Sequence, residues 1–274
     1  MKNVLKEELK RAIYSRGMLI AILMGCAISV SQLFGRPYEC YLINQEMDFS
    51  SYPMNYPATV VDLWLEGDVI SLESFLFFLI LPLLATLPFG TSYFTDKSNG
   101  YIKDIYMRTP RKKYLMAKYI ATFFSGGMAV VVPLLVNLVG CMMLLPNLLP
   151  QGISPGNLIQ PKMMFCEILY YDPTIYMLSF IIIDFILAGI FACLGLTSSF
   201  ITDYKIVVLI CPFFIQLFIK TICEMFLDYM WSSVYFARSG YGVQHIMILI
   251  IYGIGGILFT ATVFLIKGEK EDVF

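Results

Sequence analysis

Side chains able to do chemistry gather in one stretch of this sequence, residues 94–118, which is strongly basic in an otherwise apolar chain. A basic run of this kind binds nucleic acid, anionic lipid or another protein, and it also marks the side of a membrane on which a connection stays. The stretch contains seven of the nineteen basic residues: Lys97, Lys103, Arg108, Arg111, Lys112, Lys113 and Lys118. The rest of the chain decides which of these uses applies.

Patterns typical of catalysis or of metal binding do not occur in the sequence. It has no G-x-x-x-x-G-K-[ST] nucleotide loop and no G-x-S-x-G nucleophile elbow. Its single histidine, His245, excludes zinc motifs that need two histidines, and its seven cysteines show no C-x-x-C spacing. We therefore expect a chain that is not an enzyme and that holds no metal and no cofactor of its own.

Two further sets of residues have alternative roles that the sequence leaves open. Asp184, in "FIIIDFILAG", is the one acid deep within an apolar run. Such a charge is costly inside a membrane, so Asp184 either makes a polar contact with a neighbouring helix or lies on a translocation path. Cys40 and Cys166 fall in predicted outer loops, and a disulfide between them would require an oxidising compartment there.

The composition indicates a membrane protein. Soluble domains have about 45–50% apolar and about 25% charged residues, whereas this chain of 274 residues is 58% hydrophobic and 14% charged, with a mean hydropathy of +0.74. A membrane-crossing helix needs roughly 20 mostly apolar residues. We expect an all-α polytopic membrane protein with six spans, at about 17–35, 70–94, 114–145, 175–201, 206–226 and 246–266.

Four prolines lie inside these predicted spans. Neighbouring helices in a membrane can supply partners for the carbonyl groups that a proline leaves without a hydrogen bond. We therefore expect kinks and not breaks at Pro82, Pro88, Pro133 and Pro212.

The distribution of lysine and arginine predicts the orientation. Fifteen of them fall in the N-terminal segment, the second and fourth connections and the tail, against three on the other side. Positive charge stays in the cytosol, so both termini are predicted to be cytosolic in a multi-pass protein of the bacterial plasma membrane. This topology explains most of the basicity of residues 94–118 without a nucleic-acid partner.

The N-terminal residues 1–16 are predicted to form an amphipathic helix. Leu5, Leu9, Ala12 and Ile13 share one face, opposite a charged face. Such a helix lies in the headgroup plane of the bilayer. A cleaved signal peptide is the alternative, but the apolar run continues past Cys26. The chain then divides into this helix, a transmembrane domain at 17–266 and a cytosolic tail at 267–274.

A second short helix is predicted at about 99–108. Tyr101, Ile102, Ile105 and Tyr106 recur at helical spacing, and Thr109-Pro110 ends the helix. The apolar stripe of this helix indicates a docking element, with the membrane surface as the alternative partner.

The first outer loop, 36–68, is long and acidic, with Glu39, Glu46, Asp48, Asp62, Glu66 and Asp68.

The segment "LPLLATLPFGTSYFTDKSNGYIKDIYMRTPRKKYLMAKYIATFF" resembles the core of bacterial ABC transporter permeases of the type-2 exporter family. In that family an Asp-Lys/Arg-x-x-Gly-x-Ile/Leu element leads to a short coupling helix and then to Arg, Tyr and Lys at the start of the third span. The matching residues are Asp96, Lys97, Gly100, Ile102, Ile105, Arg108, Tyr114 and Lys118. The segment "LKEELKRAIYSRGMLIAIL" is similar to the family's elbow helix and first span.

The resemblance implies a permease subunit of six spans that pairs with a second copy or a paralogue and binds separate ABC ATPase subunits. Those subunits would bind ATP and Mg²⁺. The coupling residues implied here are Asp96, Gly100, Tyr101, Ile102, Asp104, Ile105 and Arg108, and the elbow-helix interface comprises Leu5, Glu8 and Leu9. The alternatives are an ion-coupled carrier that depends on Asp184, and a membrane scaffold without transport.

Overall fold

The computed structural model describes residues 2–47, 56–149, 164–241 and 246–271, and within these ranges it contains helices and no strand. Most of the apolar runs predicted as spans are single helices. The helices are α1 (Lys2–Ile13), α2 (Arg16–Leu33), α3 (Arg36–Glu46), α4 (Val60–Leu63), α5 (Leu72–Thr86), α6 (Ser92–Ser98), α7 (Tyr101–Arg108), α8 (Arg111–Leu144), α9 (Cys166–Tyr171), α10 (Pro173–Ser198), α11 (Lys205–Phe226), η1 (Tyr229–Trp231), α12 (Ser233–Phe236), η2 (Ser239–Tyr241), α13 (Ile246–Ile250), η3 (Ile251–Gly255) and α14 (Gly256–Lys270).

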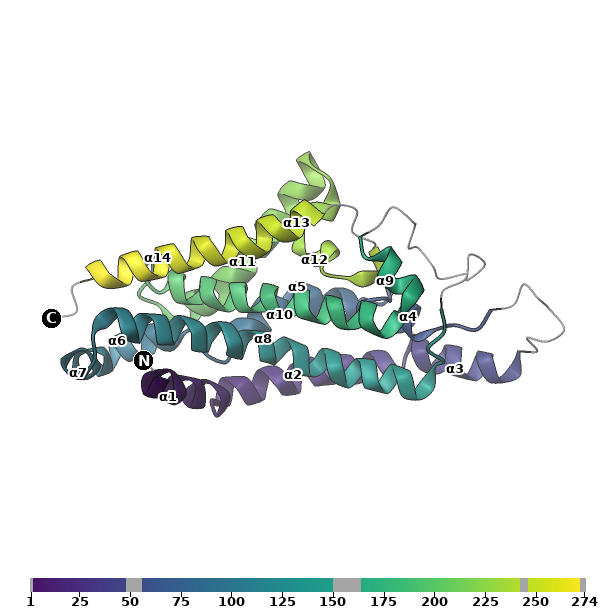
Figure 1. Ribbon diagram of the computed structural model, residues 1–274, viewed down its shortest axis with the longest axis horizontal. Coiled ribbons are helices and arrows are strands. Elements are labelled where there is room, and N and C mark those ends of the chain that lie inside the picture. The colour runs from purple at the N-terminus through teal and green to yellow at the C-terminus, as the bar shows by residue number, and fades with distance from the viewer. Residues whose placement is uncertain (1, 48–55, 150–163, 242–245, 272–274) are drawn as a thin grey trace.

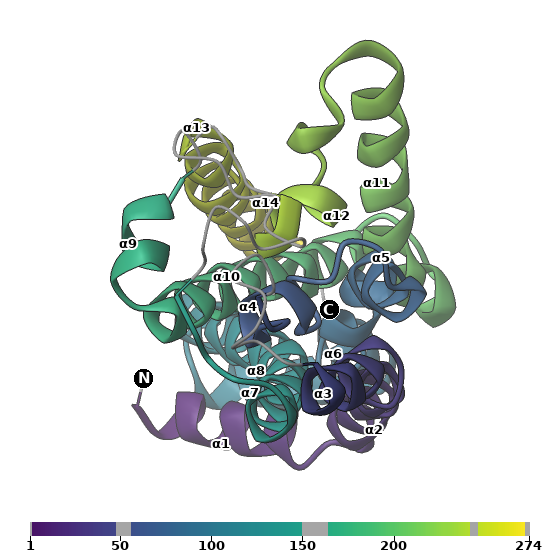
Figure 2. The same cartoon turned by 90° about the vertical axis from the view of Figure 1, so that its right-hand side faces the viewer.

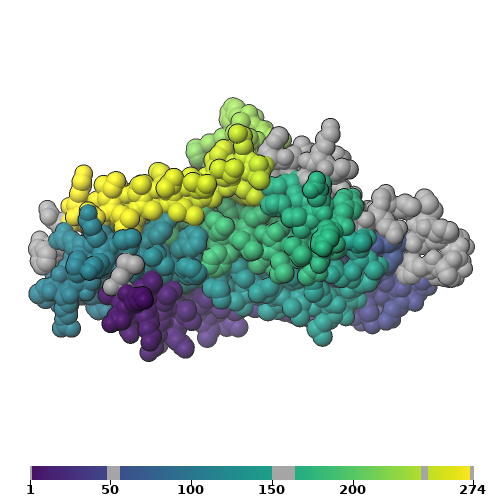
Figure 3. All heavy atoms as spheres, in the orientation of Figure 1, coloured from purple at the N-terminus to yellow at the C-terminus, as the bar shows by residue number. Residues whose placement is uncertain are grey.

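The long helices run roughly along one axis, so the molecule has two distinct ends (Figure 1). One end holds α1, α6, α7 and the last turns of α14, and we call it the terminal end. The opposite end holds α3, α4 and α9, and we call it the loop end. In the space-filling view, α14 covers one side of the terminal half, and the teal surface around α6, α7 and the start of α8 forms the tip (Figure 3).

Helix α10 is the centre of the bundle and is the most buried of the long helices. It packs most extensively against α8, which in turn packs against α1 and α2. Seen from the loop end, α11 and α14 stand as separate columns on one side of α10, with α2 and α8 on the other (Figure 2). The glycines of "FFSGGM" allow the close approach of α8 to α10, because a Cβ on Gly126 would lie 2.4 Å from the Cβ of Ala192.

In the described part of the chain, five helices are long and apolar enough to cross a membrane. They correspond to the predicted spans at 17–35, 114–145, 175–201, 206–226 and 246–266. Three of the four prolines, Pro82, Pro133 and Pro212, lie within continuous helices, as expected.

The predicted second span, 70–94, is not one helix, and the prediction of a kink at Pro88 is wrong. Helix α5 has 15 residues and ends at Thr86, before the turns that lead to α6. The carbonyl of Pro88 accepts a 2.9 Å hydrogen bond from Ser15 Oγ, and the Ser92 amide donates to the Phe89 carbonyl at 3.0 Å. At the break, Ser15 is therefore the donor to the Pro88 carbonyl, which in a continuing helix would accept from the Ser92 amide.

Part of the first predicted outer loop folds into the bundle. Residues 59–68, which we call the plug, are buried except for Asp62. Trp64 and Leu65 are inaccessible to solvent and belong to the main core. Polar side chains of the surrounding helices satisfy the plug backbone: Gln32 donates to the Leu63 carbonyl, and Asn137 accepts from the Leu65 amide, each at 2.8 Å.

Candidate functional site

A buried cluster of charges lies at the terminal end, where three helices meet. Asp96 of α6 bonds to Arg11 of α1 at 2.7 Å, and it also forms an ion pair with Lys118 of α8. Lys118 reaches Glu8 of α1 at 3.0 Å, and Tyr114 of α8 donates to Asp96 at 2.8 Å. We call Glu8, Arg11, Asp96, Lys118 and Tyr114 the charge cluster. It joins α1, α6 and α8 by side chains that lie far apart in sequence.

The electrostatics of the charge cluster account for its burial. Lys118 is fully buried and Asp96 is 4% exposed, which is tolerated only because two carboxylates face two cations with direct hydrogen bonds. Burial alone would raise the pKa of Asp96, but the charge of Lys118 and the hydrogen bond from Arg11 outweigh it, so the pKa is lowered. Burial likewise lowers the pKa of Arg11, and Asp96 and Glu8 more than restore it.

Aromatic rings complete the surroundings of both cations. Lys118 Nζ lies 4.4 Å from the ring centroid of Phe89, and the Arg11 guanidinium lies 4.8 Å from that of Tyr101. Cation–π contacts of this kind are strongest where water is excluded. Tyr101 opens α7, so the Arg11 stack connects the charge cluster to that helix.

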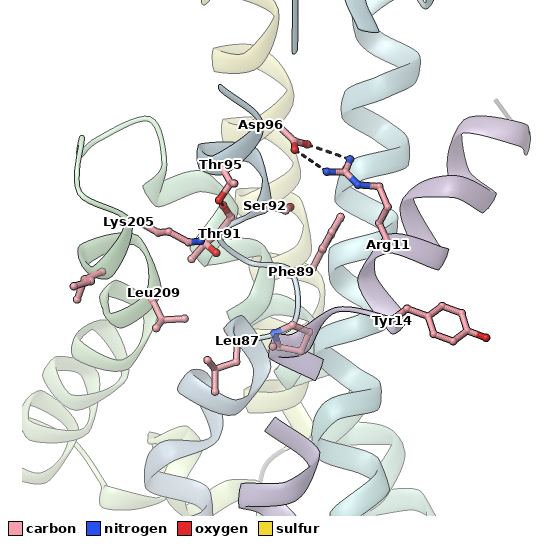
Figure 4. Close-up of a pocket in the computed structure, with 13 residues that line it drawn as sticks. Arg11, Tyr14, Leu87, Phe89, Thr91, Ser92, Thr95, Asp96, Lys205 and Leu209 are labelled. Carbon is pink, nitrogen blue, oxygen red and sulfur yellow. Dashed lines mark hydrogen bonds and ion pairs between the residues drawn. The ribbon is translucent and has the colours of Figure 1, made fainter. Parts of the chain in front are cut away.

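A cavity of about 580 Å³ adjoins the charge cluster. It lies between the end of α1, the turns after α5, α6 and the start of α11, and Figure 4 shows Arg11 and Lys205 on opposite sides of it. Thr91, Ser92 and Thr95 are among its lining residues. The Arg11–Asp96 bonds close one wall, drawn as dashed lines in Figure 4.

Helix α7 spans Tyr101–Arg108, close to the predicted 99–108. Gly100 precedes it with φ of 74°, a left-handed conformation that lets the chain turn sharply between α6 and α7. Ile102 is fully buried, and Ile105 and Tyr106 pack with it against Tyr93 and Tyr114.

The apolar stripe of α7 therefore faces the protein's own bundle. The outward face of the helix is made of the exposed residues Tyr101, Lys103, Asp104, Met107 and Arg108. Of the coupling residues predicted from the sequence, Asp96 and Ile102 are buried supports, Ile105 is half-buried, Gly100 forms the corner, and Tyr101, Asp104 and Arg108 are exposed.

The residues predicted at the elbow-helix interface lie on α1. Glu8 is buried in the charge cluster, Leu9 packs against Ala12, Phe89 and Ala121, and Leu5 is half-buried. Helix α1 thus lies against α8 through its own buried face.

The C-terminal segment also takes part in the terminal end, which sequence reasoning missed. Glu271 accepts a 2.6 Å hydrogen bond from Tyr93 and pairs with Lys97 at 2.5 Å. Arg111 stacks on Tyr106 at 4.9 Å and donates to the Glu271 carbonyl at 3.4 Å. Glu271 had no distinguishing signal, because it lies in the short charged stretch after the last apolar run, predicted as a tail.

At the loop-end half, Asp184 of α10 is fully buried beside Glu66 of the plug. The sequence placed Glu66 in an acidic outer loop and gave no sign of this contact. Cys40 lies in α3 and Cys166 begins α9, and both are thiols in the structure. Their pairing in an oxidising compartment stays a prediction. His245 lies outside the described residues.

Comparisons with protein-family models, with curated proteins and with solved structures find no match for this chain.

Proposed function

We propose that this chain is the membrane-spanning permease subunit of an ATP-driven exporter of the type-2 ABC family. In this proposal α1 is the elbow helix, α5 with α6 forms the remaining span, and α7 is the coupling helix. Two such subunits, identical or paralogous, form the translocation path. Separate ABC ATPase subunits bind ATP and Mg²⁺ and dock at the terminal end, which faces the cytosol of a bacterium.

The observation that carries the proposal is the charge cluster at the base of α7. A coupling helix must transmit displacement to the spans instead of bending away from it. Buried ion pairs between α1, α6 and α8 hold the base of α7 in one geometry. The packing of Ile102 against the buried Tyr93 and Tyr114 joins α7 directly to α6 and α8. A push on α7 would therefore reach α8, one of the long apolar helices.

The charge distribution gives further support. Cations concentrate around α1, α7 and the start of α8, as expected of the cytosolic side of a membrane protein. Away from this end, α11 and α14 are apolar and largely unburied. Such helices suit contact with lipid or with a second subunit.

The structure changes which residues of α7 a partner would meet. Because the apolar stripe is covered by the bundle, an ATPase would contact the outward face, with Met107 as its apolar centre. Met107 is 73% exposed. Lys103, Asp104 and Arg108 surround it with charges of both signs, a composition typical of an interface rim.

We therefore expect Met107→Glu to weaken docking of the ATPase roughly tenfold, the effect of losing about 1.4 kcal/mol at an interface. The measurement is the Mg²⁺-dependent ATP hydrolysis that purifies with the tagged chain from its native membrane. The matched control is Tyr171→Glu, which puts the same charge on a residue of α9 that is 84% exposed at the loop end.

The proposal predicts reduced ATP hydrolysis for Met107→Glu and unchanged hydrolysis for Tyr171→Glu. Equal hydrolysis in the wild type and both variants would place the docking surface elsewhere. Failure of any ATPase to purify with the wild-type chain would contradict the function itself and favour the carrier or the scaffold.

A further inference from the structure

The plug brings an acidic side chain to the middle of the bundle. Glu66 and Asp184 are both fully buried, and their carboxyl groups are electrostatic neighbours. Asp184 lies near the middle of α10, whereas Glu66 lies between α4 and α5. The two carboxyls therefore form a direct polar contact between the plug and the central helix.

No donor from the described residues reaches any of the four carboxyl oxygens of this pair. The nearest guanidinium, that of Arg238, donates instead to the Asp68 carbonyl at 2.7 Å and lies 4.8 Å from the Tyr241 ring centroid. Arg36 pairs with Asp68. Two buried carboxylates facing each other without donors would repel strongly, so the contact needs a proton between them.

The balance of charges around the plug also indicates that the carboxyl pair holds one proton. Leaving aside the partly exposed Asp62, the buried acids are Glu66, Asp68 and Asp184, and the cations beside them are the buried Arg238 and Arg36, the partner of Asp68. With every group ionised the region would carry one excess negative charge in a buried setting. A single proton on the carboxyl pair makes the region neutral.

We propose that Glu66 and Asp184 form a proton-binding site in which the two carboxyls share one proton, and that this proton fastens the plug to α10. A protonated carboxyl is the donor that the contact lacks. Loss of the proton leaves two facing carboxylates and favours separation of the plug from α10. The site shares no residue with the charge cluster and stands independently of the exporter proposal.

The groups facing the pair set the direction of its pH dependence. Arg238, just before η2, and Tyr176 of α10 face the pair directly. Asp68 of the plug acts through Arg238, and Arg36 of α3 acts through Asp68. Burial, followed by the neighbouring Asp184 carboxyl, raises the pKa of Glu66, and Arg238 acts in the opposite direction. Stability that depends on a raised carboxyl pKa is complete at low pH and is lost as the pH rises through the folded-state value.

Infrared spectroscopy of the full chain in lipid nanodiscs tests for the proton directly. We expect the wild type at neutral pH to show a carbonyl band of a protonated carboxylic acid that shifts in heavy water. Glu66→Gln and Asp184→Asn should each abolish the band, because the amide supplies the donor and keeps the region neutral. The matched control is Glu73→Gln, a partly exposed acid that accepts from Ser71, and it should keep the band.

The thermal unfolding temperature of the same four proteins, measured across a range of pH, is a second test. The wild type and Glu73→Gln should lose stability from mildly acidic to mildly alkaline pH, whereas Glu66→Gln and Asp184→Asn should lose less. Absence of the band from the wild type, or its persistence in both amide variants, would overturn the proposal. So would the same loss of stability in all four proteins, or a shift of the wild-type unfolding temperature by sodium ions at constant pH.

Discussion

At the scale of single residues, the terminal end depends on a balance of charge and not on any one bond. Asp96 accepts from Arg11, Tyr114 and Lys118, and Glu8 shares the two cations. Removing one member leaves the opposite charge buried without its partner, which costs more than the lost bond. The residues of the charge cluster are therefore expected to respond to substitution as a group.

Asp96→Asn should destabilise the protein by about 3 kcal/mol, because Lys118 is left buried with a single carboxylate shared with Arg11. Adding Lys118→Met restores a neutral Glu8–Arg11 pair, so the double variant should cost less than the sum of the two single variants. Equilibrium unfolding in mixed micelles measures this double-mutant cycle. The control is Lys97→Met, which breaks an ion pair nearer the surface and should cost under about 1 kcal/mol. Strict additivity of Asp96→Asn and Lys118→Met would refute the grouping.

Because of the Asp96 carboxylate, we also expect the stability of the protein to fall at low pH. Burial raises the pKa of Asp96, but Lys118 and Arg11 lower it by more, so the net effect is a lowered pKa. The native state therefore favours the ionised form of Asp96. Its contribution to stability is present above the ordinary range of an aspartate and is lost as the pH falls through the folded-state value. The wild type should therefore lose more stability on acidification than Asp96→Asn, measured by thermal unfolding in the same micelles.

At the scale of elements, α7 shows what an amphipathic pattern predicts and what it does not. The spacing of Tyr101, Ile102 and Ile105 located the helix within two residues at its start. The pattern cannot tell whether an apolar face meets another protein or its own chain, and here the stripe mostly meets the bundle. The plug was missed for a different reason: its apolar residues at 60–65 are interrupted by Asp62, are too few for a span and are followed by acids.

The corner before α7 gives a prediction at this scale. Gly100 has a left-handed φ of 74°, and a Cβ there would meet nothing within 4 Å. Gly100→Ala should therefore cost about 1 kcal/mol through backbone strain alone, and Gly100→Asn should cost less. Gly255→Ala is the control, since that site is equally open and has ordinary helical dihedrals. Equal stability of Gly100→Ala and Gly255→Ala in the same unfolding assay would show that the corner is not required.

At the scale of the whole molecule, two buried polar regions lie toward opposite ends of one helical bundle. The charge cluster secures α7 at the terminal end, and the plug closes onto α10 toward the loop end, with α8 and α10 running between them. Composition was enough to predict a helical membrane protein. Contacts such as Glu66 with Asp184 join residues distant in sequence, so no local pattern in one sequence could reveal them.

The most direct test of the exporter proposal is photo-cross-linking from the outward face of α7. A photoreactive amino acid replaces Met107 in one protein and Tyr171 in another, and both are irradiated in native membranes. If α7 is the coupling helix, position 107 gives an adduct with a nucleotide-binding ATPase subunit, identified by mass spectrometry, and position 171 gives none. Adducts with lipid alone at position 107, or the same adducts at both positions, would contradict the proposal.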